Sequence, residues 1–96
     1  MKVKLTTNAR RRLLQIPDHH SAKKSRKILR SIDKGVKKLE DFPHLGQVEN
    51  QLEEEGKGHR YLLVEGLYKI IYLIAAPFIF ITDIFNTRQD PDNMKP

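Results

Sequence analysis

The sequence predicts an α+β domain with the element order β-α-α-β-β-β, in which two antiparallel helices pack on one face of a small, mainly antiparallel sheet. Two patterns predict this fold. Between residues 9 and 39, apolar side chains recur at three- and four-residue steps, as they do along amphipathic helices. From Tyr61 onward the chain is rich in β-branched and aromatic residues, which favour strands. A chain of 96 residues makes one domain, and we assign residues 1–96 to it.

A short strand and two helices are expected between the N-terminus and Pro43. Lys2–Leu5 alternates polar and apolar residues, as an edge strand does. Thr6, Thr7 and Asn8 offer N-cap oxygens for a first helix, which we expect to end just before Pro17 because proline cannot donate a backbone hydrogen bond. A linker leads to Ser21, a good cap for a second helix that Asp41-Phe42-Pro43 ends.

Three strands are expected in the last third of the chain. After a Gly- and Glu-rich loop at 43–58, they span about 59–65, 67–75 and 78–86. Glu65-Gly66 predicts a two-residue hairpin turn, with glycine supplying the positive φ angle.

That turn sets which side chains share a face of the sheet. Its register makes Arg60 and Lys69 diagonal neighbours on the face away from the helices, and it places His59 on the helix-facing side. The face away from the helices would also carry four apolar side chains: Leu62, Val64, Ile71 and Leu73. Such a face needs a cover, which either the C-terminal tail or a partner would supply.

Composition excludes several classes of protein. The chain has no cysteine, which rules out disulfides and thiolate zinc sites. Its longest apolar stretch, Ile70–Ile81, has twelve residues interrupted by Pro77, whereas a membrane-spanning helix needs about 20. The segment Met1–Leu5 lacks the apolar run of a signal peptide. We therefore expect a soluble, cytoplasmic protein that makes no membrane contact.

Positive charge is concentrated in the N-terminal half. Residues 1–46 hold thirteen Lys and Arg against four Asp and Glu, while residues 47–58 hold one Lys against four Glu. Such a field favours an acidic partner, either nucleic acid or an acidic protein. The Lys-rich second helix and the Arg10-Arg11-Arg12 run could be a nucleic-acid surface. Basic helix faces are, however, most often simply solvated, and no aromatic residue is interleaved here for stacking.

The histidines do not predict a metal site. The spacing of His19, His20, His44 and His59 is irregular, no His-x-x-x-His pair occurs, and no cysteine supports them. Asp33, on the second helix, is expected to pair with a lysine three or four residues away rather than to do acid–base work. We expect neither a metal nor another cofactor.

Three short motifs carry a resemblance to a known family. They are Phe42-Pro43-His44-Leu45-Gly46 at the end of the second helix, Leu67-Tyr68-Lys69-Ile70-Ile71-Tyr72 in the central strand, and Thr87-Arg88-Gln89-Asp90-Pro91 after the last strand. Together, in this order and spacing, they resemble the RelE/ParE family of small bacterial toxins over nearly the whole chain. The resemblance implies the toxin of a type II toxin–antitoxin system, as found in plasmid stabilisation and stress response, with a separate acidic antitoxin as partner.

The two branches of that family act differently. RelE-like members cleave messenger RNA on the ribosome, whereas ParE-like members poison DNA gyrase and are not nucleases. The first and third motifs look more like the ParE side. A ParE-like toxin that acts by binding is therefore the first expectation, and a RelE-like ribosome-dependent endoribonuclease is the alternative. An inactive member kept for partner binding or autoregulation is a third, and operator DNA would be reached through the antitoxin.

Arg60, Lys69 and Arg88 are the candidate catalytic residues. Three cations around one sheet face could hold a phosphate, and the resemblance implies such a site because RelE-like nucleases carry basic residues at these positions. A nuclease also needs a proton acceptor and donor, which RelE-like toxins place near the C-terminus as Tyr or His. Residues 92–96 contain neither.

The alternative for the same three residues is purely structural. Arg60 and Lys69 would then be solvated strand residues. Arg88 would pair with Asp83 or Asp90 and hold the tail in place.

Overall fold

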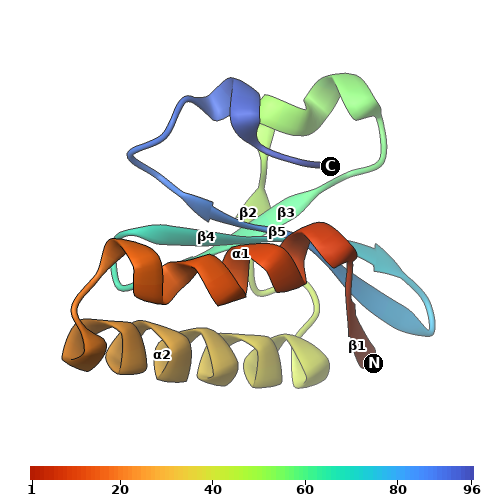
Figure 1. The fold of residues 1–96 in the computed structure, drawn as a ribbon. Helices are drawn as coiled ribbons and strands as arrows, with labels where there is room; N and C mark the ends of the chain where they lie inside the picture. Colours follow the sequence, from red (N-terminus) through yellow and green to blue (C-terminus); the bar gives the residue numbers. More distant parts are fainter.

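The computed structural model describes residues 1–96 and confirms the predicted order of elements and the α+β architecture (Figure 1). A five-stranded sheet with the order β1-β5-β4-β3-β2 carries both α-helices on one face; β1 is parallel to β5 and the other pairs are antiparallel. The elements are β1 (Lys2–Leu5), α1 (Thr7–His19), α2 (Ala22–Asp41), β2 (Gln47–Val48), the 3₁₀ helix η1 (Asn50–Glu55), β3 (Arg60–Val64), β4 (Tyr68–Ala75), β5 (Phe78–Asn86) and the 3₁₀ helix η2 (Pro91–Asn93).

Both helices begin at predicted caps, α1 at the first of its three candidates, but α1 ends later than expected. The hydroxyl of Thr6 accepts a hydrogen bond from the Ala9 N–H, and that of Ser21 accepts one from the Lys24 N–H, each over 3.2 Å. The prediction that α1 ends before Pro17 is wrong, because the helix continues to His19. A proline in the last turn removes only one donor, and its fixed φ angle is itself helical.

The main core lies between the helices and the sheet. It contains 13 buried residues from α1, α2, the sheet and the β3–β4 connection, among them Ile28, Ile32 and Leu39 of α2. Gly35 lies on the same side of α2, where a Cβ atom would be 3.0 Å from Cδ1 of Ile70 and 3.2 Å from Cδ2 of Leu62. Glycine therefore lets α2 approach the sheet closely.

The predicted two-residue turn between β3 and β4 is wrong. Val64 pairs with Tyr68, and Leu63 pairs with Lys69, so three residues connect the strands. Glu65 and Gly66 both have positive φ angles, of 54° and 60°. Because side chains alternate along a strand, this one-residue difference turns every side chain of β3 to the other face.

The open face of the sheet is consequently less apolar than expected. Leu62 and Val64 belong to the helix-side core, not to the face away from the helices. On that second face, Ile71 is fully buried and Leu73 half-buried.

The chain itself supplies a cover for the second face. A smaller buried cluster contains one residue each from η1, β4, β5 and the C-terminal tail: Leu52, Ile71, Phe85 and Met94. Residues 43–58 are thus more than the predicted loop, because they form β2 and η1. In Figure 1, η1 and the tail lie on the side of the sheet opposite α1 and α2. The expected cover by the tail is confirmed, with η1 as a second contributor.

The tail is held at β5 by polar contacts. The Lys95 N–H donates to Oδ2 of Asp83 over 2.9 Å, and the Thr82 hydroxyl donates to the Lys95 carbonyl over 3.1 Å. Asp83 is fully buried, and its Oδ1 lies 3.2 Å from Nε of Arg12 in α1. This ion pair connects the helix layer to the tail across β5.

No helix is long and apolar enough to cross a bilayer.

Candidate functional site

The structure does not bring the predicted basic residues together. Arg60 is paired with Tyr72 in the sheet and lies on the helix side, where its Nη1 donates to the Gly46 carbonyl over 2.8 Å. Lys69 lies on the opposite face, since it pairs with Leu63 rather than with Leu62. The prediction that Arg60 and Lys69 are neighbours on one face is wrong, and the turn described above is the reason.

Lys69 is engaged in a largely buried ion pair. Its Nζ lies 2.8 Å from Oε2 of Glu49, whose side chain is 3% exposed, and 4.2 Å from the centre of the Tyr61 ring. Oε1 of Glu49 accepts a hydrogen bond from the Gln51 N–H over 3.2 Å. The ammonium group is therefore satisfied by β3 and by the start of η1, and it holds that cover against the sheet.

Arg88 remains exposed beyond β5 and takes part in none of the three ion pairs of the molecule. Its backbone N–H donates to Oδ1 of Asn86 over 2.9 Å, which fixes the turn after the strand. The alternative that Arg88 pairs with Asp83 or Asp90 is wrong, because Arg12 occupies the Asp83 carboxylate. A role of Arg88 in activity stays a prediction.

His59, which precedes Arg60 in the chain, is buried. Its side chain is 2% exposed, and its carbonyl accepts the Glu49 N–H over 2.9 Å, which extends the β2–β3 ladder. Alternation along the strand places it on the side of Tyr61, not on the predicted helix side. Burial lowers the pKa of His59, and the positive charge of Lys57 acts in the same direction.

Two of the sequence motifs meet in the structure. The Tyr72 hydroxyl donates to the Pro43 carbonyl over 2.7 Å and accepts the Gly46 N–H over 2.9 Å. A Cβ atom at Gly46 would lie 2.6 Å from that hydroxyl and 2.5 Å from the Tyr61 carbonyl oxygen, so only glycine fits. Residues 42–46 and the Tyr at the end of the strand motif thus form a structural junction rather than a site.

A polar cluster that the sequence did not predict lies between the α1–α2 linker and β4. Nε2 of His20 is 2.9 Å from the Tyr68 hydroxyl, and the two rings meet edge to face. Burial raises the pKa of the nearly inaccessible Tyr68. Burial lowers the pKa of His20, and the positive charges of Lys24, His19 and Arg88 act in the same direction. No sequence pattern relates residues 48 positions apart, so only the fold reveals this contact.

No three His, Cys, Asp or Glu side chains lie close enough together to hold a metal ion.

The outer edge of β3 is open along a groove. The two-residue strand β2 covers only Arg60 and Tyr61, so the edge from Leu62 to Val64 pairs with no strand. Between this edge and α2 lies a hollow of about 450 Å³, lined by four apolar residues and by Ser31, Lys34, Gly35, Lys38 and Glu65. The four apolar residues are Leu45, Leu62, Leu63 and Val64. We call this the α2–β3 groove.

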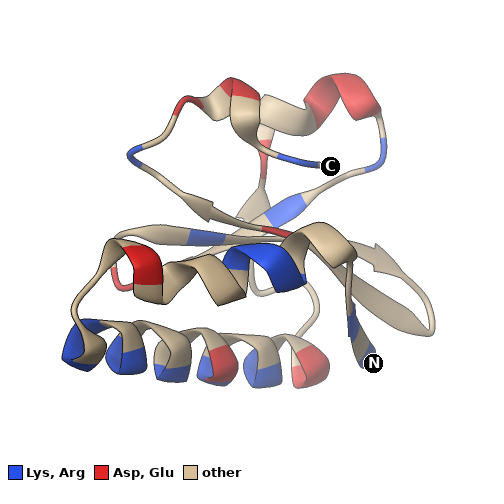
Figure 2. Ribbon diagram, viewed as in Figure 1, with Lys and Arg blue, Asp and Glu red and all other residues tan.

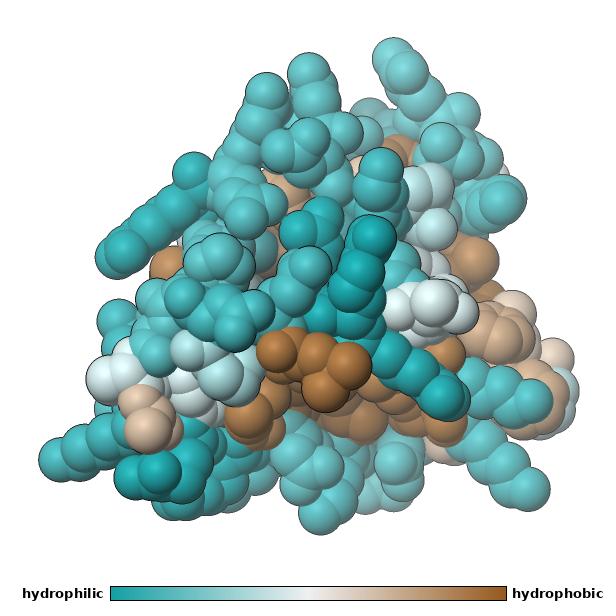
Figure 3. Space-filling view, in the orientation of Figure 1, coloured by the Kyte–Doolittle hydropathy of each residue, from teal (hydrophilic) through white to brown (hydrophobic).

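Six large apolar side chains are exposed: Met1, Leu14, Phe42, Leu45, Val48 and Leu63. Near the α2–β3 groove, Leu63 is 52% exposed and Leu45 49%. On the helix face, Leu14 of α1 is 79% exposed, and Figure 3 shows an apolar patch among hydrophilic side chains where α1 and α2 run side by side. The α2–β3 groove combines apolar residues with an unpaired strand edge.

Comparison with known proteins agrees with this architecture. Residues 3–91 match a family model described as the ParE toxin of the type II toxin–antitoxin system, parDE. A solved structure described as the chromosomal ParDE TA system from P. aeruginosa is similar, with a TM-score of 0.71 and 25% identity, covering 90% of this chain and 95% of that one. No curated protein matches the chain. The matched range takes in both α-helices and the whole sheet except Lys2.

Proposed function

The chain belongs to the ParE toxin family of type II toxin–antitoxin systems, and we propose that it acts in the cytoplasm by binding DNA gyrase. The separation of Arg60 from Lys69 by the sheet carries this proposal. A phosphate cannot lie against both side chains, and both are already bonded within the molecule. Electrostatic stabilisation of a transition state requires charges that converge on one point, so this trio does not favour RNA cleavage.

Arg88 is the member of the trio that is available to a target. It is exposed, belongs to no ion pair, and lies in a turn stabilised by its own backbone hydrogen bond to Asn86. Because its charge is exposed and unpaired, we propose that Arg88 belongs to the gyrase-binding surface. An exposed side chain of this kind can be replaced without disturbing the fold, which makes the proposal testable.

The test is to express the chain without antitoxin and to follow supercoiling and transcript integrity together. We expect the purified chain to inhibit gyrase supercoiling while messenger RNA stays intact. Arg88→Ala should relieve both the inhibition and the growth arrest, with an unchanged thermal unfolding curve. Transcripts cut within codons would contradict the proposal and favour the endoribonuclease. Normal growth with the wild-type chain would favour an inactive member.

We further propose that an acidic antitoxin neutralises the toxin by occupying the α2–β3 groove. An unpaired strand edge accepts an extended peptide as an additional strand, and the half-exposed Leu45 and Leu63 give it apolar side chains to cover. Lys34 and Lys38 line the same groove and match acidic side chains of the incoming segment. The gene beside this one should encode a small acidic protein.

Two leucines allow a matched test of the groove. Leu63→Asp introduces a charge at the strand edge, and Leu14→Asp makes the same change on the helix face, at a side chain that is even more exposed. In cells that co-express the antitoxin, Leu63→Asp should restore toxicity, whereas Leu14→Asp should stay neutralised. Equal neutralisation of both variants would exclude the groove but would leave the gyrase proposal standing. Toxicity without antitoxin shows that each variant is folded.

A further inference from the structure

The outer surface of α2 forms a continuous ridge of positive charge. The helix has 20 residues and carries eight cations, all exposed, against three acidic residues. The eight are Lys23, Lys24, Arg26, Lys27, Arg30, Lys34, Lys37 and Lys38. Only Lys37 is ion-paired, to Asp33 over 3.0 Å. We call this set the α2 ridge.

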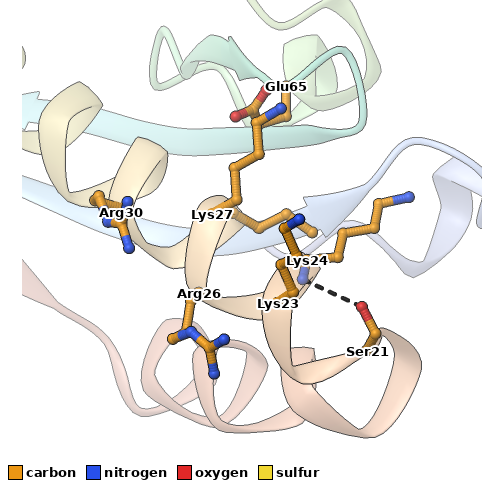
Figure 4. A pocket seen from close by; sticks show the side chains of 8 residues that line it. Ser21, Lys23, Lys24, Arg26, Lys27, Arg30 and Glu65 are labelled. Atoms are coloured by element: carbon orange, nitrogen blue, oxygen red, sulfur yellow. Dashed lines mark hydrogen bonds between the residues drawn. The ribbon is translucent and has the colours of Figure 1, made fainter.

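The N-terminal half of the ridge surrounds the largest hollow of the molecule (Figure 4). Its volume is about 750 Å³, and five of its eight lining residues are cations. Glu65 is the single carboxylate, and its Oε1 already accepts a hydrogen bond from the Ser31 hydroxyl over 2.7 Å. Figure 4 shows the side chains of Lys23, Lys24, Arg26 and Arg30 extending from the helix in several directions. The hollow therefore has an excess of unpaired donors.

Negative charge gathers at the other end of the molecule. Figure 2 shows carboxylates on η1 and on the C-terminal tail, on the side of the sheet opposite α2. Residues 47–58 contain four Glu and one Lys, and Asp90 and Asp92 belong to the tail. Such a separation of charge orients the molecule in an external field, with the α2 ridge toward an anionic surface.

The composition of the ridge indicates which kind of anion it fits. Protein interfaces need a buried apolar or aromatic centre, and the side chains around this hollow include one hydrophobic residue, the buried Ile28. A phosphate backbone needs only charge. No aromatic side chain lines the hollow for stacking on unpaired bases. A helix of this length spans about 30 Å, close to one turn of a double helix at about 34 Å.

We propose that the α2 ridge binds the phosphate backbone of duplex nucleic acid without reading its sequence. The ridge shares Lys34 and Lys38 with the α2–β3 groove, whereas its N-terminal half, which includes Lys23 and Lys27, lies outside that groove. The inference therefore does not depend on the proposed function. In a complex with gyrase or with an operator-bound antitoxin, the ridge would add contacts to the DNA that is already there. In the absence of gyrase and antitoxin, the chain should bind a duplex more tightly than single strands of equal charge.

The test measures binding of a fluorescent duplex by anisotropy over a range of salt concentrations. With roughly four phosphate contacts, affinity should fall about a hundredfold between about 50 and about 200 mM salt. Lys23→Gln/Lys27→Gln should weaken binding roughly tenfold or more at low salt and reduce the salt slope by about 1.8, because two contacts are lost. Lys23→Arg/Lys27→Arg should bind as the wild type does.

A matched control separates the ridge from net charge alone. Lys57→Gln/Lys95→Gln removes the same charge from two exposed lysines at the acidic end, and it should change affinity less than twofold. Equal losses in both double variants would overturn the proposal, as would binding that neither variant affects. Displacement of the duplex by poly-glutamate at equal charge would also overturn it, because the ridge would then fit an acidic protein. Unchanged thermal unfolding shows that each variant is folded.

Discussion

The Gly46 amide donates a hydrogen bond to the Tyr72 hydroxyl over 2.9 Å, and this contact fastens the end of α2 to the central strand. The same hydroxyl donates to the Pro43 carbonyl, and the Tyr72 side chain is fully buried. Arg60 completes the junction by donating to the Gly46 carbonyl. Pro43, Gly46 and Tyr72, which belong to two of the motifs that resemble the toxin family, therefore stabilise the fold.

Tyr72→Phe should destabilise the protein without changing its core volume. The substitution leaves the Gly46 N–H and the Pro43 carbonyl without their partner, and an unsatisfied buried polar group costs about 1–3 kcal/mol. Urea unfolding measures the change. The control is Tyr61→Phe, which removes an exposed hydrogen bond to Gln47 and should cost less than about 0.5 kcal/mol. Similar losses in the two variants would contradict the role given to Tyr72.

Gly46→Ala and Gly35→Ala should differ sharply. At Gly46 the new Cβ would lie 2.5 Å from a backbone oxygen, which cannot move away without breaking the strand, so we expect a loss of several kcal/mol. At Gly35 the neighbours are the flexible ends of Ile70 and Leu62, at 3.0 and 3.2 Å. There a gain in helix propensity of about 1 kcal/mol offsets part of the strain. Thermal unfolding of both variants measures the two losses of stability. A Gly46→Ala variant as stable as the wild type would contradict the close contact between Gly46, Tyr61 and Tyr72.

Lys69→Met should be costly because it leaves the Glu49 carboxylate buried and unpaired. We expect a loss toward the lower end of about 3–5 kcal/mol, since the Lys69 side chain keeps 23% exposure. Glu49→Gln/Lys69→Met should lose much less than the sum of the single variants. Urea unfolding of the four proteins gives the coupling free energy, and additive losses would show that the ion pair contributes nothing.

The stability of the protein should fall as the pH drops below about 6.5. Burial holds the pKa of His59 below its ordinary value of 6.5, so folding favours the neutral ring. The stability that the neutral His59 ring gives the folded protein is fully present above the pKa of 6.5 of the unfolded chain. It is lost as the pH falls from 6.5 toward the lower pKa that His59 has in the folded protein. His20 acts in the same direction.

Unfolding in urea between about pH 5 and about pH 8 measures this dependence. His59→Leu should have a flatter profile than the wild type, because a buried leucine has no proton to bind. His44→Gln, at an exposed position, should keep the wild-type profile. A His59→Leu profile as steep as that of the wild type would assign the effect elsewhere.

The sequence predicts local features well and long-range ones poorly. The caps at Thr6 and Ser21 depend on a side chain three residues from its partner, and the structure confirms both. The β3–β4 turn differs by one residue from the prediction, because Val64 pairs with Tyr68 and Leu67 joins Glu65 and Gly66 in the connection, a pairing that no local pattern distinguishes from the expected one. This one-residue difference places Arg60 on the face opposite Lys69, so the predicted basic site does not form.

The sequence by itself determined the order of elements and the resemblance to the toxin family, because periodicity and short motifs are properties of neighbouring residues. Only the tertiary structure decided what the charged side chains do. Lys69 meets Glu49 and Arg12 meets Asp83 across 20 and 71 positions of the chain. The register of the strands places Lys69 on the face of Glu49, and the packing of α1 on the sheet brings Arg12 to Asp83. A one-residue difference in a turn moves every side chain of one of the two strands that it joins to the other face of the sheet. The same order of elements can therefore place charged residues together or apart, and only the tertiary structure shows which.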